Sequence, residues 1–403
     1  MTGTHAASSD SARLTLPANP AIRLATLIAM MAGATCVGVT FTAMPPILTQ
    51  LAEHFGGGGK GELIAQAVMT TPGMGLVLGG TAAGWLIGRL GGQKLLLAAL
   101  LLYGAAGSVG LFADDLVELG IARFLVGFAA ANVMTCCNFF IGEFFGEVKR
   151  GRMIAAATAV GGTLSTSSVL LSGYLGEHGG WREPFALYPI VILPFFLLAF
   201  ALPKGEVPAA RPEESTGRVL PLLWPIYLMI GAIYVVVMMT STQMSFLLRE
   251  NGITSPVIFS RIIGLAYGFL ILGAVMYGAV QERLGPRRTF ELGLLLLAFG
   301  IGPLGLVQGA WAAGFFAAMK GLGSGMLNAG FIHIVLNAAP PHLRGRAIGL
   351  MLTAQYLGDF ANPFVVAPIR FLLGIHGAFV VFGLALVAGF LWSVLRRRQP
   401  AVA

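Results

Sequence analysis

Twelve apolar stretches, each long enough to cross a bilayer as a helix, follow one another along this chain. A transmembrane helix needs about 20 mostly apolar residues. The runs are continuous rather than alternating, which argues against membrane-spanning strands. The sequence therefore predicts an all-α polytopic membrane protein. The expected spans are 21–51, 62–88, 93–113, 116–144, 149–176, 184–202, 220–248, 256–281, 288–307, 309–338, 343–371 and 375–395.

Composition excludes the main soluble alternatives. Charged residues make up 10% of the chain and hydrophobic residues 56%, and the mean hydropathy is +0.82. A soluble domain carries about 25% charged residues, so a soluble enzyme, a nucleic-acid-binding protein and a disordered protein are excluded. The sequence has no nucleophile–base pair, metal-ligand cluster or ATP-binding loop at working spacing. We expect no enzymatic activity and no cofactor, and the three cysteines suggest no disulfide framework.

Polar segments divide the chain almost in half. The region before the first span is rich in Ser, Ala and Thr and does not resemble a cleaved signal peptide. One long polar connection separates the sixth span from the seventh. The expected parts are a disordered cytoplasmic tail (1–20), an N-terminal six-helix bundle (21–202), a cytoplasmic linker (203–219), a C-terminal six-helix bundle (220–395) and a basic cytoplasmic tail (396–403).

The distribution of basic residues predicts the orientation. If the N-terminus is cytoplasmic, 18 of the 25 Lys and Arg residues lie in cytoplasmic segments and five in outside segments. Cytoplasmic loops are enriched in Lys and Arg, so both termini are expected inside a bacterial inner membrane. The net charge of +8 is therefore a topology signal, and we expect no nucleic-acid partner.

The two halves of the sequence are related by an internal repeat. A shift of 194 residues places Gly79 on Gly273 and Gly127 on Gly321 without a gap, and 150–152 on 344–346 in the same register. An even number of spans in each repeat gives two six-helix units with the same orientation. Parallel repeats about an axis along the membrane normal are used by secondary transporters.

Two related stretches, 84–94 and 278–288, follow corresponding spans of the two halves. The first is similar to the loop motif between spans two and three of the major facilitator superfamily, and the second resembles a second copy of that motif. Residues 119–131 resemble the span-four motif of proton-driven members, whereas 44–48 and 180–185 resemble the drug:proton antiporter-like branch. The resemblance implies twelve helices in two pseudo-symmetric six-helix bundles.

The resemblance implies a secondary transporter that works by alternating access. Its expected partners are a small organic solute, protons and the lipid bilayer, and the protein is expected to be a monomer. The branch favours export of a drug-like compound or metabolite, although span five lacks the Gly-Pro pair of many exporters. The alternative is proton-linked uptake of an organic anion, a zwitterion or a siderophore-like solute. A channel, or a receptor with the same fold, fits the repeat and the short polar segments less well.

Intramembrane polar residues indicate which helices line a path. Spans three, six, nine and twelve are apolar all round and are expected to face lipid. The other eight spans carry polar groups, which hydrocarbon does not tolerate unless they face protein or a wet cavity. The expected cavity residues are Asn132, Met134, Asn138, Tyr234, Gln243, Ser324, Asn328, His333, Gln355 and Asn362.

Three charged residues are expected to be buried near mid-membrane, namely Arg123, Lys320 and Asp359. A charge at such a depth needs a partner or a function. Lys320 and Asp359 have similar expected depths, so we expect Asp359 to carry the coupled proton, with Lys320 as its counter-charge and Arg123 assisting. The alternative is a permanent structural ion pair.

The loop motifs are expected to form a cytoplasmic gate. Arg89 is expected to pair with Glu143, and Glu282 to lie near Arg150 at the start of span five; alternatively, these charges only set the topology. Gly84 and Gly278 are expected at close helix contacts, and Gly91 and Gly285 at turns. The complete set of gate and loop residues is Gly84, Arg89, Gly91, Glu143, Arg150, Gly278, Glu282, Arg283, Gly285 and Arg344.

Overall fold

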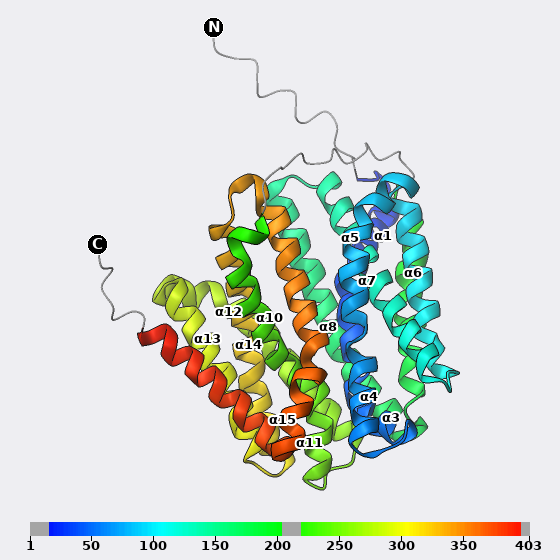
Figure 1. Ribbon diagram of the computed structural model, residues 1–403. Coiled ribbons are helices and arrows are strands. Elements are labelled where there is room, and N and C mark those ends of the chain that lie inside the picture. Colours follow the sequence, from blue (N-terminus) through cyan, green and yellow to red (C-terminus); the bar gives the residue numbers. More distant parts are fainter. Residues whose placement is uncertain (1–15, 204–218, 396–403) are drawn as a thin grey trace, which may run out of the picture.

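The computed structural model describes residues 16–203 and 219–395, which are helical apart from short connections (Figure 1). The expected C-terminal tail and most of the expected N-terminal tail and linker lie outside the described residues. The first half contains α1 (Pro20–Ala29), α2 (Ala32–Thr42), α3 (Leu48–His54), α4 (Gly58–Thr70), α5 (Pro72–Leu90), α6 (Gly92–Ser108), α7 (Leu116–Phe144), α8 (Glu147–Gly179) and α9 (Leu187–Ala199). The second half contains α10 (Val219–Thr242), α11 (Met244–Glu250), α12 (Pro256–Leu284), α13 (Pro286–Ile301), α14 (Ala310–Ala338) and α15 (Arg344–Leu395).

These helices supply the predicted membrane spans. Nine helical segments in the described part of the chain are long and apolar enough to cross a bilayer. One of them, α15, contains two spans, because Gly374 has a φ of +71° and breaks the helix. With the second arm of α15, the shorter α9 and the glycine-rich α14, the described residues provide twelve spans. The all-helical fold class predicted from the sequence is confirmed.

Two ends of the helical array can be distinguished. The linker face is the end where α1 begins and α9 finishes; there the Thr26 hydroxyl lies 3.5 Å from the Ala201 carbonyl oxygen. The far face is the opposite end, where α3, α4 and α11 lie (Figure 1). The linker face corresponds to the end that the sequence predicts to be cytoplasmic.

Glycine contacts confirm the repeat in three dimensions. Gly79 of α5 lies against the backbone of Phe128 in α7, and Gly273 of α12 lies against the backbone of Leu322 in α14. Gly273 and Leu322 lie 194 positions after Gly79 and Phe128, respectively. Small residues allow helix backbones to approach closely in a membrane. A second related set of contacts joins Gly127 to Pro72 and Gly321 to Ala266.

The packing role expected for Gly84 and Gly278 is wrong. A Cβ atom built at either position meets no atom within 4 Å among the described residues. Gly84 lies five residues after Gly79 on α5, so the two residues point to different sides of the helix. The turn roles of Gly91 and Gly285 are confirmed, because their φ angles of +82° and +78° lie in the region that favours glycine.

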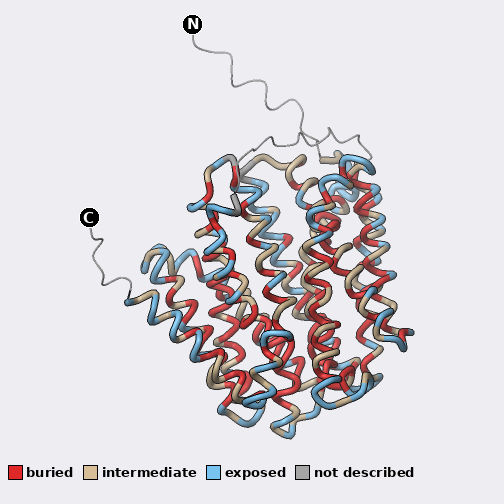
Figure 2. Tube along the Cα trace, viewed as in Figure 1, coloured by how far each residue is buried: buried red, intermediate tan, exposed pale blue. Residues whose placement is uncertain are grey.

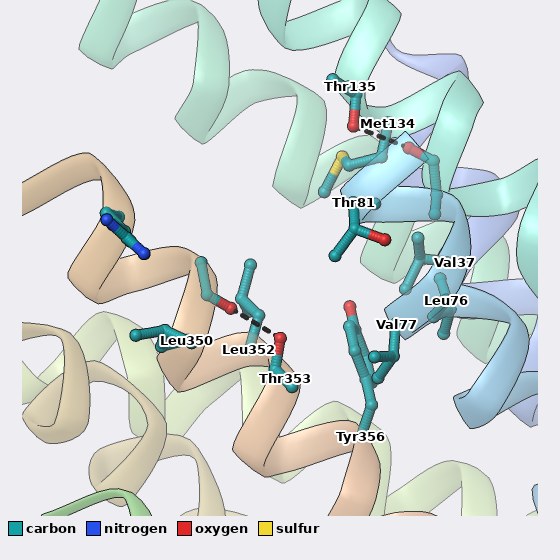
Figure 3. A pocket seen from close by; sticks show the side chains of 14 residues that line it. Val37, Leu76, Val77, Thr81, Met134, Thr135, Leu350, Leu352, Thr353 and Tyr356 are labelled. Carbon is teal, nitrogen blue, oxygen red and sulfur yellow. Dashed lines mark hydrogen bonds between the residues drawn. The ribbon is translucent and has the colours of Figure 1, made fainter. Parts of the chain in front are cut away.

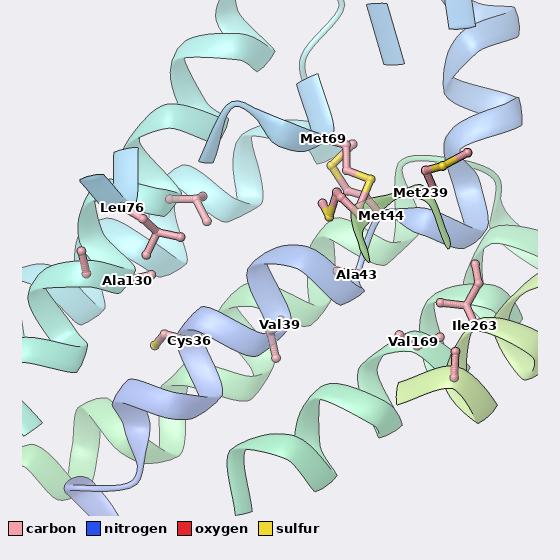
Figure 4. Close-up of a cluster of buried hydrophobic side chains, with 14 of the residues drawn as sticks. Cys36, Val39, Ala43, Met44, Met69, Leu76, Ala130, Val169, Met239 and Ile263 are labelled. Atoms are coloured by element: carbon pink, nitrogen blue, oxygen red, sulfur yellow. The ribbon is translucent and has the colours of Figure 1, made fainter. Parts of the chain in front are cut away.

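The apolar core extends across the boundary between the halves. Met44 and Met69 of the first half belong to the same buried cluster as Met239 of the second half (Figure 4). Exposed positions lie mainly on the outer helices and at the two ends (Figure 2). The predicted lipid-facing spans carry exposed apolar side chains, among them Leu101, Leu193, Phe299 and Leu384.

Candidate functional site

A cavity of about 420 Å³ lies between the two halves, toward the linker face. Helices α2, α5 and α7 supply one wall, and the first part of α15 supplies the other (Figure 3). Thr81, Met134, Thr353 and Tyr356 occupy opposite sides of the space. The lining residues are Val37, Leu76, Val77, Gly80, Thr81, Ala131, Met134, Thr135, Arg346, Gly349, Leu350, Leu352, Thr353 and Tyr356.

The cavity lining is mostly apolar, with a few hydroxyl groups. The hydroxyls of Thr81, Thr135 and Thr353 donate to carbonyls on their own helices, at 2.9, 2.9 and 3.1 Å. Their oxygens can therefore act as acceptors for a solute. Arg346 is the one charged residue in the lining that the structure describes, and no carboxylate lines the cavity there. The site suits a partly apolar organic solute.

Ion pairs join the two halves at the far face. Arg249 of α11 pairs with Glu53 of α3 at 3.0 Å and with Glu62 of α4 at 2.6 Å, and Arg370 of α15 also pairs with Glu62. We call these residues, together with Glu250, the far-face cluster. Beside it, amide groups of Gln243 and Gln66 hydrogen bond at 2.7 Å across the same boundary. The halves are therefore held together at the end opposite the cavity.

Lys320 and Asp359 are both buried within the second half, on α14 and α15. They do not form a contact ion pair among the described residues, although each lies within the electrostatic field of the other. Tyr356 lies three residues before Asp359 on α15, so the two side chains are neighbours on one side of the helix. Tyr356 also lines the cavity. It is therefore adjacent both to Asp359 and to the space that a solute would occupy.

Arg123 lies in a different environment, buried in the first half. Its guanidinium donates to the Tyr188 hydroxyl and, at 2.7 Å, to the Thr40 carbonyl. Its Nε has no hydrogen-bond partner among the described residues. Thr40 precedes Pro45 and Pro46, which lack the N–H groups that would continue the helix. Arg123 therefore has a hydrogen-bond partner at this break, and neither Tyr188 nor Thr40 belongs to the described lining of the cavity.

Most of the predicted cavity residues lie outside the cavity. Met134 lines it, whereas the other nine do not appear in its lining. Asn362 is fully buried and accepts from Thr242 and donates to the Val235 carbonyl. Buried positions are Asn132, Gln243, Ser324, Gln355 and Asn362; Tyr234, Asn328 and His333 are half-buried, and Asn138 is exposed.

The predicted gate residues do not form the expected ion pairs among the described residues. Arg89 is exposed and stacks on the Trp85 ring at 4.1 Å, and among the described ion pairs none joins it to Glu143. Glu282, Arg283 and Arg150 are exposed. The Nε of Arg344 donates to the Leu336 carbonyl at 3.1 Å. The pairing of Arg89 with Glu143 therefore stays a prediction for a state closed at the linker face.

Sequence reasoning did not identify several residues that the structure brings together. Tyr356 and Thr353 carry no charge. They lie in a span that was already expected to be polar, so nothing in the sequence distinguished them from their neighbours. Glu62 and Arg370 lie near the ends of predicted spans, where charged residues are common. The one available signal was their position, since a carboxylate and a guanidinium at the same membrane depth in different halves can pair.

A helical membrane protein with a cavity between two repeated bundles, closed at one end by contacts between them, has the architecture of a secondary transporter. The family model of the Major Facilitator Superfamily matches residues 28–363 and, in a second match, 226–403. The chain belongs to this superfamily and is a multi-pass membrane transporter of small organic solutes rather than an enzyme.

Curated relatives and solved structures agree with this assignment. The chain is 27% identical to a gallate transporter of Pseudomonas putida, over 62% of this chain and 66% of that one. It is 25% identical to a 3-(3-hydroxy-phenyl)propionate transporter of Escherichia coli, over 82% and 84%. It is 21% identical to the multidrug resistance protein MdtG of Klebsiella pneumoniae, over 60% and 63%. A D-xylose-proton symporter structure superposes with a TM-score of 0.74 at 16% identity, over 92% and 97%.

Proposed function

We propose that this protein is a proton-coupled transporter of organic carboxylates, including aromatic ones, in a bacterial inner membrane with the linker face in the cytoplasm. The observation that carries the proposal is the composition of the cavity, whose lining has hydroxyl groups, a tyrosine and one arginine, and no carboxylate among the described residues. An apolar wall accommodates a ring, and hydroxyl groups orient polar substituents.

The names of two relatives support this substrate class. Gallate and 3-(3-hydroxyphenyl)propionate are carboxylates with a hydroxylated ring, and the transporters named for them are similar to this chain over most of its length. The identity of 25 to 27% leaves the individual acid to experiment.

Asp359 and Lys320 are the proposed coupling residues. A buried carboxylate without a contact cation keeps its charge at a high cost, and a proton removes that cost. Approach of the Lys320 ammonium stabilises the ionised form, and separation from it favours the protonated form. A solute in the cavity can influence this proton equilibrium through Tyr356, which lines the cavity and is a neighbour of Asp359 on α15.

The experiment is flux into proteoliposomes with an imposed pH gradient. Labelled gallate and labelled 3-(3-hydroxyphenyl)propionate are tested with the gradient in each direction, which also reports whether the cycle imports or exports. We expect accumulation that collapses with a protonophore. No flux of either acid above protein-free liposomes would contradict the proposed substrate class.

Export of an amphipathic drug is the second candidate. The similarity to MdtG favours it, as do the apolar side chains of Leu76, Val77 and Met134 in the cavity. An ethidium arm in the same liposomes distinguishes the two candidates. Proton-driven ethidium flux without carboxylate flux would establish the second candidate in place of the first.

A further inference from the structure

A second cavity, of about 960 Å³, lies at the far face between α4 and α15. The first half contributes Lys60, Glu62 and Gln66, and the second half contributes Arg370 and the rings of Phe364 and Phe371. The cavity therefore spans the boundary between the halves, where a transporter must open to admit a solute from that side. In the proposed orientation this side is the outside.

Arg370 is the most connected residue of this cavity. Its side chain is 15% exposed and pairs with Glu62 of the other half. Within its own half, it donates to the Gln243 side-chain oxygen at 3.1 Å, lies 3.6 Å from a Glu250 oxygen, and packs 5.3 Å from the centre of the Phe246 ring. When the halves separate at this face, Arg370 keeps these neighbours and loses Glu62.

We propose that Arg370 forms an outer subsite for an aromatic carboxylate, and that the substrate carboxylate replaces Glu62 on its guanidinium. The inference rests on the proposed function for its ligand class. A guanidinium binds a carboxylate through two parallel hydrogen bonds. Phe364 and Phe371 supply ring surfaces in the same cavity, and Lys60 adds a second cation.

This exchange lowers the free-energy cost of opening the far-face cluster. Breaking the partly buried pair with Glu62 removes the nearer carboxylate from Arg370 and leaves only the more distant one of Glu250, at 3.6 Å, which is costly. A substrate carboxylate offers Arg370 an equivalent partner, so the ion pair is exchanged rather than lost. Glu62 on the first-half helix α4 then retains one partner in the second half, Arg249 at 2.6 Å, instead of two. An uncharged solute offers no such exchange.

Arg249 provides a matched control. It pairs with the same Glu62, at 2.6 Å, and is absent from the described lining of the outer cavity. Arg249→Gln and Arg370→Gln therefore each remove one arginine from Glu62, whereas Arg370→Gln alone removes the proposed carboxylate receptor. Equal effects of the two substitutions would mean that the arginines act only as a lock.

The experiment measures protection of a cysteine from outside. Leu63→Cys places a thiol in the outer cavity, and the three native cysteines are buried. Intact cells are labelled with a membrane-impermeant maleimide, with 3-(3-hydroxyphenyl)propionate or its uncharged amide present. We expect protection by the acid only. Arg370→Gln should raise the concentration for half-protection by at least about tenfold, Arg370→Lys should recover it partly, and Arg249→Gln should leave it unchanged or lower it.

Other outcomes overturn the subsite. Protection by the acid and the amide alike, no protection in the parent, or equal effects of the two glutamine variants would each contradict it. Protection requires binding but no flux, so its result is separate from the test of the proposed function. Proteoliposomes that transport the acid while the cysteine stays unprotected would remove the subsite and leave the transport function standing.

Discussion

Replacing Gly79 by alanine tests the packing of the first bundle. A Cβ at this position would lie 2.5 Å from the Phe128 carbonyl oxygen and 3.0 Å from the Ala131 Cβ, both on α7. The nearer neighbour is backbone, so it cannot turn aside as a flexible side chain could. Relief requires α5 and α7 to move apart, and contacts along both helices are then weakened.

The structure supports an estimate of the cost. Overpacking a well-packed contact costs about 1–3 kcal/mol, and alanine recovers about 1 kcal/mol of helix propensity over glycine. We expect Gly79→Ala to lower the free energy of unfolding by up to about 2 kcal/mol. At Gly84 a Cβ meets no atom within 4 Å, so Gly84→Ala should be neutral or stabilise the protein by up to about 1 kcal/mol.

The assay uses the protein's own thiols. Cys36, Cys136 and Cys137 are free and buried, so a dye that fluoresces on reaction with thiols reports unfolding during heating in detergent. The parent and both variants are compared at the same detergent concentration. Gly79→Ala should melt several degrees below the parent and Gly84→Ala at or above it. Equal melting temperatures for the two variants, or the reverse order, would refute the packing argument.

Three further predictions concern charge and backbone geometry. Asp359→Asn should abolish pH-driven accumulation and preserve counterflow of the substrate, whereas accumulation by Asp359→Asn combined with Lys320→Met would exclude Asp359 as the proton carrier. Arg123→Lys should lower the melting temperature, because an ammonium cannot maintain both hydrogen bonds of the buried guanidinium, and Arg89→Lys, at an exposed position, should leave it unchanged. Gly91→Ala should cost about 1 kcal/mol or more, because alanine is strained at a φ of +82°; an unchanged melting temperature would contradict this.

The fold was predictable because each span carries its own signal. A continuous apolar run specifies a transmembrane helix regardless of its neighbours, so even the two arms of α15 were separated correctly at 371–375. The repeat was equally accessible, since Gly79 and Gly273 retain both their spacing and their contacts. Gly84 and Gly278 show the limit of this reasoning, because a glycine in a motif does not reveal whether another helix faces it.

The site was less predictable because it depends on how each helix is rotated about its axis. Polarity suggested that the face of span eleven with Gln355, Asp359 and Asn362 borders the cavity. In the structure, Asn362 bonds to α10, and the neighbouring face with Thr353 and Tyr356 lines the cavity. Successive residues differ by about 100° around a helix, so a modest rotation exchanges one face for the other. Interhelical contacts fix that rotation, and a single sequence does not contain them.

Partial solvent exposure of the far-face cluster gives it a sensitivity to ionic strength. The side chains of Glu53, Glu250 and Arg249 are 67%, 48% and 27% exposed. Mobile ions screen such charges over a Debye length of about 8 Å at physiological salt and about 3 Å at 1 M. Concentrated salt therefore weakens the attraction between the halves at this end while leaving the apolar core intact. In the proposed orientation, we therefore expect the salinity of the surrounding medium to shift the balance between the two open states without occupying a binding site.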